Sequence, residues 1–308
     1  MKKPKLLLTG GSGLLALNWA YLMRDVWDVH LLTNNHIVSL PDVSSSKVDL
    51  GNIGEILRAI QHISPDLIVH TAGLTNVDLC EVDPKASYQA NVAISKNVAL
   101  SAKKVLTPLI HISTDHLFSG DKSFSREGDL PNPLNEYARS KLLAEKIVME
   151  EFENALIIRT NFFGWGHKNR QSLSDWIIYS LRSEKKLSLF SDSYITPILI
   201  DNFVEAAHEL IDKKISGILN LTGDERISKY EFGLKLAQKF QLPTNLIIPS
   251  SITSINFPAK RPHDMSLSNE SVKKLLGREM GNIDLFFSKL RIQELEGRPH
   301  ALFDSVLV

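Results

Sequence analysis

A tyrosine and a lysine four residues apart, Tyr137 and Lys141, are the side chains of this sequence best suited to moving a proton. On a helix, this spacing places the phenol and the ammonium on one face. A free tyrosine has a pKa about three units above neutrality, and a nearby cation favours the phenolate and lowers that pKa. Such a phenol can protonate a carbonyl oxygen as hydride reaches the carbon. The pair therefore indicates carbonyl reduction, although a solvated helix face can carry the same two residues.

A hydroxyl group, that of Thr114, directly follows a predicted buried strand over residues 108–113. Ligands of open α/β sheets bind at the carboxyl ends of the strands, so this hydroxyl is expected in a ligand site. It could hydrogen-bond a substrate carbonyl and hold it within reach of hydride. Thr114, Tyr137 and Lys141 are therefore the candidate catalytic residues.

A glycine-rich loop, TGGSGLLA at residues 9–16, lies between the first predicted strand and the first predicted helix. Glycine permits a tight turn and close approach of backbone to ligand, and the helix N-terminus offers free N–H groups to a phosphate. Ala16 supplies the third small residue, which lets the helix pack closely on the strand. A plain turn is the alternative, but the strand before and the helix after favour a dinucleotide-binding loop.

The end of the second predicted strand should distinguish NAD from NADP. The residues there are Thr33, Asn34, Asn35 and His36. They include no carboxylate to hold a ribose 2′-hydroxyl or repel a 2′-phosphate, and no arginine to clamp a 2′-phosphate. The sequence therefore slightly favours NADP(H) over NAD(H).

Short apolar runs alternate with longer helical patterns through the first half of the chain. This alternation predicts parallel strands covered on both faces and joined by right-handed crossovers. We expect an α/β fold: a doubly wound, mostly parallel Rossmann sheet with a smaller α/β substrate-binding lobe. Strands are predicted at residues 5–9, 28–33, 66–70, 108–113 and 156–159, and helices at 14–24, 53–63, 87–105 and 137–151.

The pattern becomes less regular after residue 162. We expect a dinucleotide-binding domain over residues 1–162, to which the chain returns around residues 187–222. Residues 163–186 and 223–308 are assigned to the smaller lobe and a C-terminal tail. Within these segments, helices are predicted at 174–183, 202–213 and 229–240, and strands at 187–190 and 217–221.

Composition excludes several classes of protein. Of 308 residues, 43% are apolar and 23% charged, which is typical of soluble globular proteins. The 35 basic and 35 acidic residues cancel, so no global field gathers nucleic acid or membrane. The single Cys80 excludes an internal disulfide. The N-terminus resembles a secretory signal only until the glycine loop interrupts it, and a cytoplasmic protein is expected.

Three histidines, His70, His111 and His116, lie on or next to predicted strand ends. Their distant spacing gives no metal-ligand signature, so no metal is predicted. His70 and His111 are interpreted as core or cleft histidines with satisfied hydrogen bonds. His116 is closer to the proposed chemistry and is a candidate substrate contact.

Together, these motifs resemble the extended short-chain dehydrogenase/reductases, and within them the dTDP-4-dehydrorhamnose reductase family. The resemblance covers residues 5 to about 277 and is specific to the family but not to one substrate. Weaker matches are Thr196-Pro197 and Arg261-Pro262. The matching stretches are LTGGSG at 8–13, TAGLTNVD at 71–78, STDHLF at 113–118, NEYARSK at 135–141 and RTNFFG at 159–164.

The resemblance implies NAD(P)H-dependent reduction of a nucleotide-linked 4-keto-6-deoxy sugar, with Tyr137 as proton donor. It also implies that Asn91 supports a proton relay. A homodimer is a possible assembly, since dimers are the commonest soluble oligomers. The implied catalytic residues are Thr114, Tyr137 and Lys141; the implied cofactor contacts are Gly13, Leu14, Leu15, Asp49, Leu50, Gly73, Leu74, Thr75, Tyr137 and Lys141; the implied substrate contacts are Asp115, Phe162 and Arg261. The glycine loop and the end of the second strand add Gly10, Ser12 and Asn34 to the expected cofactor contacts, and His116 is added to the substrate contacts by its position.

The chain departs from the family pattern at four positions. Ala16 replaces the third glycine of the loop. His116 stands where these reductases usually carry tyrosine, Leu79 where they carry lysine, and Phe162 where they carry tryptophan. The last three positions surround the expected substrate, so the identity of the sugar stays open.

Two other functions remain possible on the sequence. Epimerases and 4,6-dehydratases share the superfamily, but dehydratases follow the threonine with an Asp-Glu pair, whereas Asp115 is followed here by His116. The other alternative is a non-catalytic dinucleotide-binding protein like the regulatory subunit of methionine adenosyltransferase. The tail at residues 291–308 could then be a docking segment, although a frayed terminus or packing arm is favoured.

Overall fold

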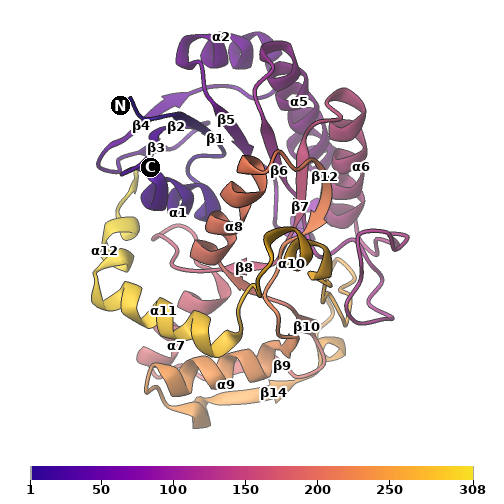
Figure 1. Ribbon diagram of the computed structural model, residues 1–308. Helices are drawn as coiled ribbons and strands as arrows, with labels where there is room; N and C mark the ends of the chain where they lie inside the picture. The colour runs from indigo at the N-terminus through magenta and orange to yellow at the C-terminus, as the bar shows by residue number, and fades with distance from the viewer. Residues whose placement is uncertain (1, 308) are drawn as a thin grey trace.

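The computed structural model describes residues 2–307 and centres on a seven-stranded parallel sheet (Figure 1). Its strands are β1 (Lys5–Thr9), β2 (Asp28–Thr33), β4 (Val43–Lys47), β5 (Leu67–His70), β6 (Leu109–Ile112), β7 (Leu156–Arg159) and β12 (Gly217–Asn220). Their order is β12-β7-β6-β5-β1-β2-β4, and each neighbouring pair is parallel. The predicted Rossmann-like α/β fold is therefore confirmed.

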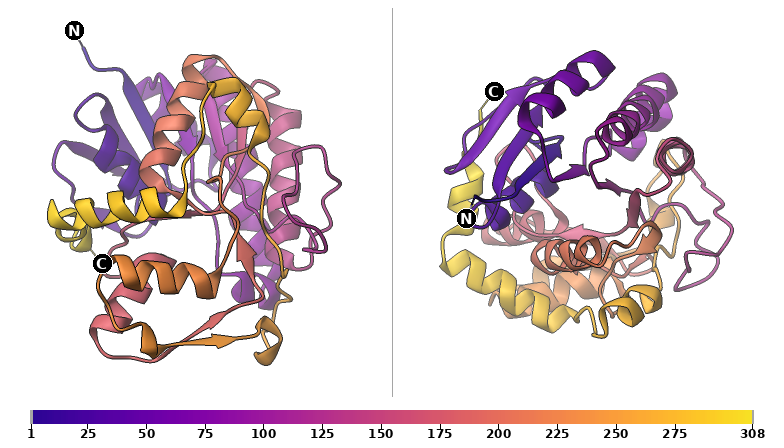
Figure 2. Two further views of the ribbon diagram at one scale, coloured as in Figure 1. Left: turned by 60° about the horizontal axis from the view of Figure 1, so that its bottom comes forward. Right: turned by 45° about the horizontal axis from the view of Figure 1, so that its top comes forward.

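Helices cover both faces of this sheet (Figure 2). On one face α1 (Leu14–Met23) packs against α8 (Ile200–Asp212). On the other face α5 (Ile94–Val105) lies between α2 (Ile53–Ile63) and α6 (Glu136–Glu151). Successive β1 side chains enter different cores: Leu6 and Leu8 join the cluster that holds Trp19, whereas Leu7 joins the cluster that holds Ile56. Burial on both faces explains why the strands read as continuous apolar runs.

Side-chain caps fix the starts of two helices on the second face, α2 and α6. Asn52 precedes α2, and its side-chain oxygen accepts hydrogen bonds from the N–H groups of Gly54 and Glu55. Asn135 precedes α6 and accepts from the Ala138 N–H at 2.9 Å. Such caps satisfy amides that have no partner within the helix. The α6 cap sets where the helix that carries Tyr137 begins.

The helix predicted over residues 87–105 is interrupted. The chain forms α3 (Val77–Val82), α4 (Pro84–Tyr88), a π-helical turn over Gln89–Ala93, and then α5. Single π turns inside helices are rare and often occur at functional sites. This turn contains Asn91.

The rest of the chain builds a smaller lobe at one end of the large sheet (Figure 1). Of residues 187–222, only 217–220 join the large sheet. The predicted strand over residues 187–190 is β9, which pairs with β14 in a separate two-stranded sheet. Two further small sheets are β8 with β11 and β10 with β13. The elements are β8 (Phe162–Phe163), α7 (Leu173–Arg182), β9 (Leu187–Phe190), β10 (Tyr194–Ile195), β11 (Ile198–Leu199), β13 (Ile227–Ser228), α9 (Lys229–Lys239), a 3-10 turn (Thr244–Leu246), β14 (Ile247–Ser250) and a second 3-10 turn (Ile252–Ser254). The next helix, α10 (Glu270–Leu276), packs instead against α8 and β12.

The C-terminal segment folds back onto the first half of the chain. It forms α11 (Ile283–Leu295), α12 (Arg298–Phe303) and β15 (Val306–Leu307). The last of these pairs antiparallel with β3 (Ile37–Val38), and Figure 1 shows the yellow C-terminus beside that strand. The described part of the tail is thus a packing arm.

Within residues 2–307, the helices are too short or too polar to cross a membrane.

Candidate functional site

The predicted site residues line one cavity of about 790 Å³ at the carboxyl ends of the strands. All of them line it except Arg261. The lining residues that the sequence predicted are Gly10, Ser12, Gly13, Leu14, Leu15, Asn34, Asp49, Leu50, Gly73, Leu74, Thr75, Thr114, Asp115, His116, Tyr137, Lys141 and Phe162.

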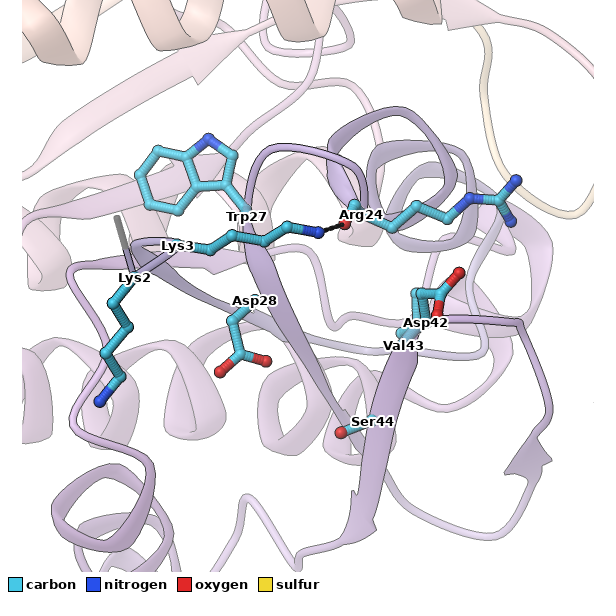
Figure 3. Close-up of a pocket in the computed structure, with 8 residues that line it drawn as sticks. All are labelled: Lys2, Lys3, Arg24, Trp27, Asp28, Asp42, Val43 and Ser44. Carbon is cyan, nitrogen blue, oxygen red and sulfur yellow. Dashed lines mark hydrogen bonds between the residues drawn. The ribbon is translucent and has the colours of Figure 1, made fainter.

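A second hollow, of about 550 Å³, lies at the opposite edge of the sheet (Figure 3). Lys2 and Lys3 precede β1 there, while Asp28 and Val43 begin β2 and β4. The Lys3 ammonium donates to the Arg24 carbonyl at 2.8 Å. Open α/β sheets bind ligands at the carboxyl ends of their strands, so this hollow is not the candidate site.

The glycine loop has the geometry of a phosphate cradle. Gly10 adopts φ +66°, and a Cβ there would lie 2.8 Å from Ala72, which leaves room for glycine alone. The Gly13 N–H donates to the Gly10 carbonyl at 2.7 Å and closes the turn. No side chain caps α1, so its first amides remain available to a ligand. These features fit the pyrophosphate of a dinucleotide.

Buried polar side chains underlie this loop. Thr9 Oγ1 lies 2.7 Å from His70 Nδ1, and His70 Nε2 lies 2.9 Å from Ser95 Oγ. The Ser95 hydroxyl donates to the Asn91 carbonyl at 2.6 Å, so it accepts from His70. The interpretation of His70 as a satisfied core histidine is confirmed. For His111 it is wrong, because neither buried ring nitrogen has a partner.

Asn91 fixes the loop that follows β5. Its side-chain oxygen accepts from the Leu74 N–H at 2.7 Å, and its amide donates to the Leu74 carbonyl at 3.1 Å. The same amide donates to Ser140 Oγ at 2.9 Å and so links this loop to α6. A Cβ on Gly73 would lie 2.8 Å from Asn91 Oδ1, so the close approach requires glycine. The π turn therefore couples the cavity wall to the helix that bears Tyr137.

Tyr137 lies in the cavity wall and is 8% exposed. Burial raises the pKa of its phenol to about 12; the Thr114 hydroxyl opposes this shift, and the Asp115 carboxylate adds to it. A pKa that high keeps the phenol protonated at neutral pH, which is the state a proton donor needs.

The pKa of Tyr137 is raised and not lowered, which corrects the effect that the sequence predicts for Lys141. Its ammonium donates to the Ile112 carbonyl at 2.7 Å. The influences on the Tyr137 pKa are burial, Thr114, Asp115, Cys80 and Arg170, and burial outweighs the rest. Burial also lowers the pKa of Lys141 itself to about 8, against the opposing charge of Glu145.

Polar groups gather beside the phenol. The Asn161 amide donates to Asp115 Oδ2 at 2.5 Å. The His116 ring meets the Tyr137 ring edge-on, with centroids 5.5 Å apart. Burial lowers the pKa of His116, with Asp115 opposing, so the ring is neutral at neutral pH. Its Nδ1 is buried and has no partner.

Three buried side-chain atoms without a hydrogen-bond partner belong to residues of this cavity. His116 Nδ1, Thr160 Oγ1 and His167 Nε2 are buried without a partner, and all three residues line the cavity. Buried polar atoms in native proteins nearly always have a partner, such as a ligand or ordered water. The cavity is therefore equipped for a polar ligand.

Arg261 differs from the other predicted contacts. Its guanidinium donates to Asp78 Oδ2 at 2.8 Å and lies over the Phe257 ring at 5.1 Å. Arg261 does not line the cavity. Its charge still helps to lower the His116 pKa, so it lies near the site. Contact between Arg261 and a substrate stays a prediction.

Sequence reasoning missed three basic residues at this site. His167 and Arg170 come from the loop between β8 and α7, and both line the cavity. Lys229 is the first residue of α9. Burial lowers the pKa of its ammonium, and the Asp115 carboxylate opposes this shift, so the two groups lie close together. None belongs to a motif or a periodic pattern.

Among residues 2–307, no cluster of His, Cys, Asp or Glu has a geometry that could hold a metal ion.

The parallel sheet, the glycine loop and the Tyr137–Lys141 helix around one cavity define an extended short-chain dehydrogenase/reductase. The sequence model described as the RmlD substrate binding domain matches residues 4–283. This chain therefore belongs to that family.

Three similar proteins have different described roles. A probable low-salt glycan biosynthesis reductase of Haloferax volcanii, Agl14, is 28% identical over 276 residues, covering 88% of this chain and 91% of that protein. Methionine adenosyltransferase 2 subunit beta of Bos taurus is 28% identical over 282 residues, covering 88% and 82%. The solved dTDP-4-dehydrorhamnose reductase of Bacillus anthracis, in complex with NADP, superposes with a TM-score of 0.83 at 23% identity, covering 94% and 99%.

Proposed function

We propose that this protein reduces a nucleotide-linked 4-keto-6-deoxy sugar with NAD(P)H. One observation carries the proposal: Thr114, Tyr137 and Lys141 line the same cavity as the glycine loop. The reductase of Haloferax volcanii and the rhamnose-type reductase of Bacillus anthracis support this reading. NADP(H) is favoured because Asn34 and its neighbours include no carboxylate, and because the Bacillus anthracis protein was solved with NADP.

The residues of this chain would divide the work as follows. A bound nicotinamide dinucleotide supplies hydride to the keto carbon. Tyr137 gives its phenolic proton to the carbonyl oxygen, and its pKa of about 12 keeps that proton in place until charge develops. Thr114 hydrogen-bonds the same oxygen and orients it. Lys141 holds the cofactor ribose with its ammonium.

Groups on the substrate side would select the sugar. Asp115 and His116 offer an acceptor and a neutral ring to hydroxyl groups, and Phe162 supplies an apolar surface. Lys229 brings positive charge close to Asp115 and suits a nucleotide diphosphate. These assignments name contacts but not one sugar.

A cofactor assay tests the proposal. The protein is incubated with NADPH or NADH and a panel of nucleotide-linked 4-keto sugars, and absorbance of the reduced nicotinamide is followed together with the sugar product. We expect one reduced cofactor consumed for each sugar reduced, with NADPH preferred. An epimerase or dehydratase returns its cofactor oxidised, so product without net consumption would contradict the reductase.

The similarity to the methionine adenosyltransferase subunit supports a second candidate function, that of a dinucleotide-binding regulatory protein. Affinity capture from cell extract distinguishes the two. Stoichiometric recovery of a methionine adenosyltransferase catalytic chain, together with no reduction of any sugar in the panel, would favour regulation. Sugar reduction by the isolated protein favours the enzyme.

A further inference from the structure

The loop over residues 166–171 forms a hydrogen-bonded turn in the wall of the cavity. The His167 N–H donates to the Arg170 carbonyl at 3.0 Å, and the Arg170 N–H donates back at 2.9 Å. The Gly166 N–H donates to Asp175 Oδ2 at 2.9 Å, which ties the turn to α7. His167, Arg170 and Gln171 line the cavity together with the glycine loop. The turn therefore holds its side chains in defined positions beside the phosphate cradle.

Arg170 spans the cavity from this turn. Its guanidinium donates to Thr75 Oγ1, on the loop that follows β5. In the part of the chain that the structure describes, Arg170 forms no ion pair with a carboxylate. Its charge helps to lower the Tyr137 pKa, so the guanidinium lies near the reaction centre. An arginine free of carboxylate partners and aimed across a ligand cavity is suited to an anion.

His167 presents a second donor beside the glycine loop. Its ring is 4% exposed, and its Nδ1 accepts a long hydrogen bond of 3.4 Å from the Asn169 N–H. The proton is therefore assigned to Nε2, which is buried and has no acceptor. Burial lowers the His167 pKa and keeps the ring neutral, while a hydrogen-bonding interaction with the Ser12 backbone opposes that shift. The ring N–H is thus held beside Ser12 of the phosphate cradle.

A C-terminal strap, residues 298–307, ties this turn to the sheet. The Lys168 N–H donates to the Phe303 carbonyl at 3.2 Å, and Ser39 N–H donates to the Ser305 carbonyl at 2.8 Å. Val306 pairs with Val38 and lines the cavity. Two hydrogen bonds of 2.7 and 2.8 Å join Arg298 to Asp201 on α8. The strap lies beyond residue 283, where the family match ends.

We propose that loop 166–171 is a phosphate-binding cover for the dinucleotide, held in place by the C-terminal strap. His167 contacts the pyrophosphate beside the glycine loop, and Arg170 contacts it from across the cavity, where its guanidinium reaches Thr75. The two halves together enclose an anion that the α1 amides alone would bind from one side. This inference rests on the proposed dinucleotide binding, and it assigns residues that the sequence did not predict.

The test measures NADPH binding in the absence of any sugar. Nicotinamide fluorescence is titrated for the wild-type protein, for Arg170→Gln and for the control Lys185→Gln, which removes an exposed cation of the same lobe outside the cavity. Loss of a charge-assisted hydrogen bond should weaken binding about tenfold or more in Arg170→Gln, with the thermal unfolding temperature unchanged. The control should bind like wild type.

A second pair of variants tests His167 in the same titration. His167→Gln keeps an N–H donor and should bind NADPH within about threefold of wild type, whereas His167→Phe should bind about tenfold more weakly. Unchanged NADPH affinity in both Arg170→Gln and His167→Phe would contradict the proposal that loop 166–171 binds the dinucleotide phosphates. If Arg170→Gln raised only the KM for the sugar nucleotide, the arginine would belong to the substrate and the inference would again be wrong. Wild-type protein that binds no NADPH would instead contradict the proposed function itself.

Discussion

At the scale of single residues, burial sets the protonation states that the proposed reduction needs. Tyr137 has a pKa of about 12 and stays protonated well above neutral pH. Lys141 has a pKa of about 8, since burial disfavours its charged form. The two groups therefore titrate far apart, and a fall in activity near pH 8 would report the lysine.

The pH profile of the reduction should report the protonation state of Lys141. A lysine pKa of about 8 means that the side chain is a charged ammonium below about pH 8 and loses its proton above it. If the ammonium holds the cofactor ribose, kcat/KM should fall as pH rises through about 8, measured with NADPH in overlapping buffers. Lys141→Met should give a low rate without this limb. A wild-type profile that stays flat well above pH 8 would contradict the role given to Lys141.

The sequence predicts residues well where a motif fixes their place in the fold. Tyr137, Thr114 and the glycine loop follow strands or begin helices, so parallel topology brings them to one edge. Arg170 and Lys229 could not be found this way, because a loop turn puts Arg170 at the cavity and packing of the smaller lobe puts Lys229 close to Asp115. The failed expectation about the phenol pKa has the same origin, since burial is a property of tertiary packing.

At the scale of elements, a buried ion pair locks the helix that carries Tyr137. Glu145 on α6 lies 2.8 Å from Arg159 at the end of β7, and the two side chains are 1% and 3% exposed. Ser113 Oγ donates to the same carboxylate at 2.5 Å. The pair joins α6 to the ends of β6 and β7, beside the cavity.

Breaking this pair should be costly. Glu145→Ala leaves a buried guanidinium without a counter-charge, and the free energy of unfolding should fall by about 3–5 kcal/mol, measured by urea denaturation. The double variant Glu145→Leu with Arg159→Met removes both charges and should recover much of that loss. A single variant as stable as wild type would show that the pair does not secure α6.

The C-terminal strap should control cofactor release. Truncation after Asp304 removes β15 and the Val306 contact with the cavity, so NADPH should dissociate several-fold faster in stopped-flow displacement. Leu295→Ala, at an exposed position of α11 outside the strap, is the control. The unfolding temperature is measured in parallel, and Val306→Asp provides a full-length variant with the same expected effect. An unchanged rate of NADPH dissociation in both the truncated protein and Val306→Asp would show that the strap does not control cofactor release.

Sequence patterns predicted most of the long elements but missed the 13-residue helix α11 and the short elements. The strands of the large sheet are apolar runs, except β4, whose sequence VSSSK is mostly polar because it forms the sheet edge. The two-residue strands β3 and β15 are too short to carry a period. The π turn at Asn91 was also missed, since it keeps a helical pattern while shifting its register.

At the scale of the whole molecule, buried neutral histidines should make the fold sensitive to acid. Burial lowers the pKa to about 3 for His70 and to about 4 for His208, and well below 6.5 for His111. The unfolded chain binds these protons from about pH 6.5 downward, whereas the folded chain does not. The free energy of unfolding should therefore fall on acidification below about pH 6.5, by about 1.4 kcal/mol per pH unit for each group.

His208 provides the matched test of this acid sensitivity. Its Nε2 accepts from the Trp19 indole N–H at 2.9 Å, so the ring must stay neutral. Gln at this position can still accept that bond but does not titrate, so His208→Gln should lose less stability between about pH 7 and about pH 5 in urea denaturation. An equal loss in the variant and the wild type would exclude His208 as a source.

The central claim is that the buried phenol of Tyr137 gives its proton to a sugar carbonyl beside a bound nicotinamide. The most direct measurement is turnover of a nucleotide-linked 4-keto sugar by Tyr137→Phe, with NADPH binding titrated in the same preparation. The account predicts NADPH affinity near that of wild type and turnover lower by about a hundredfold or more. Wild-type turnover in a variant that still binds NADPH would contradict it.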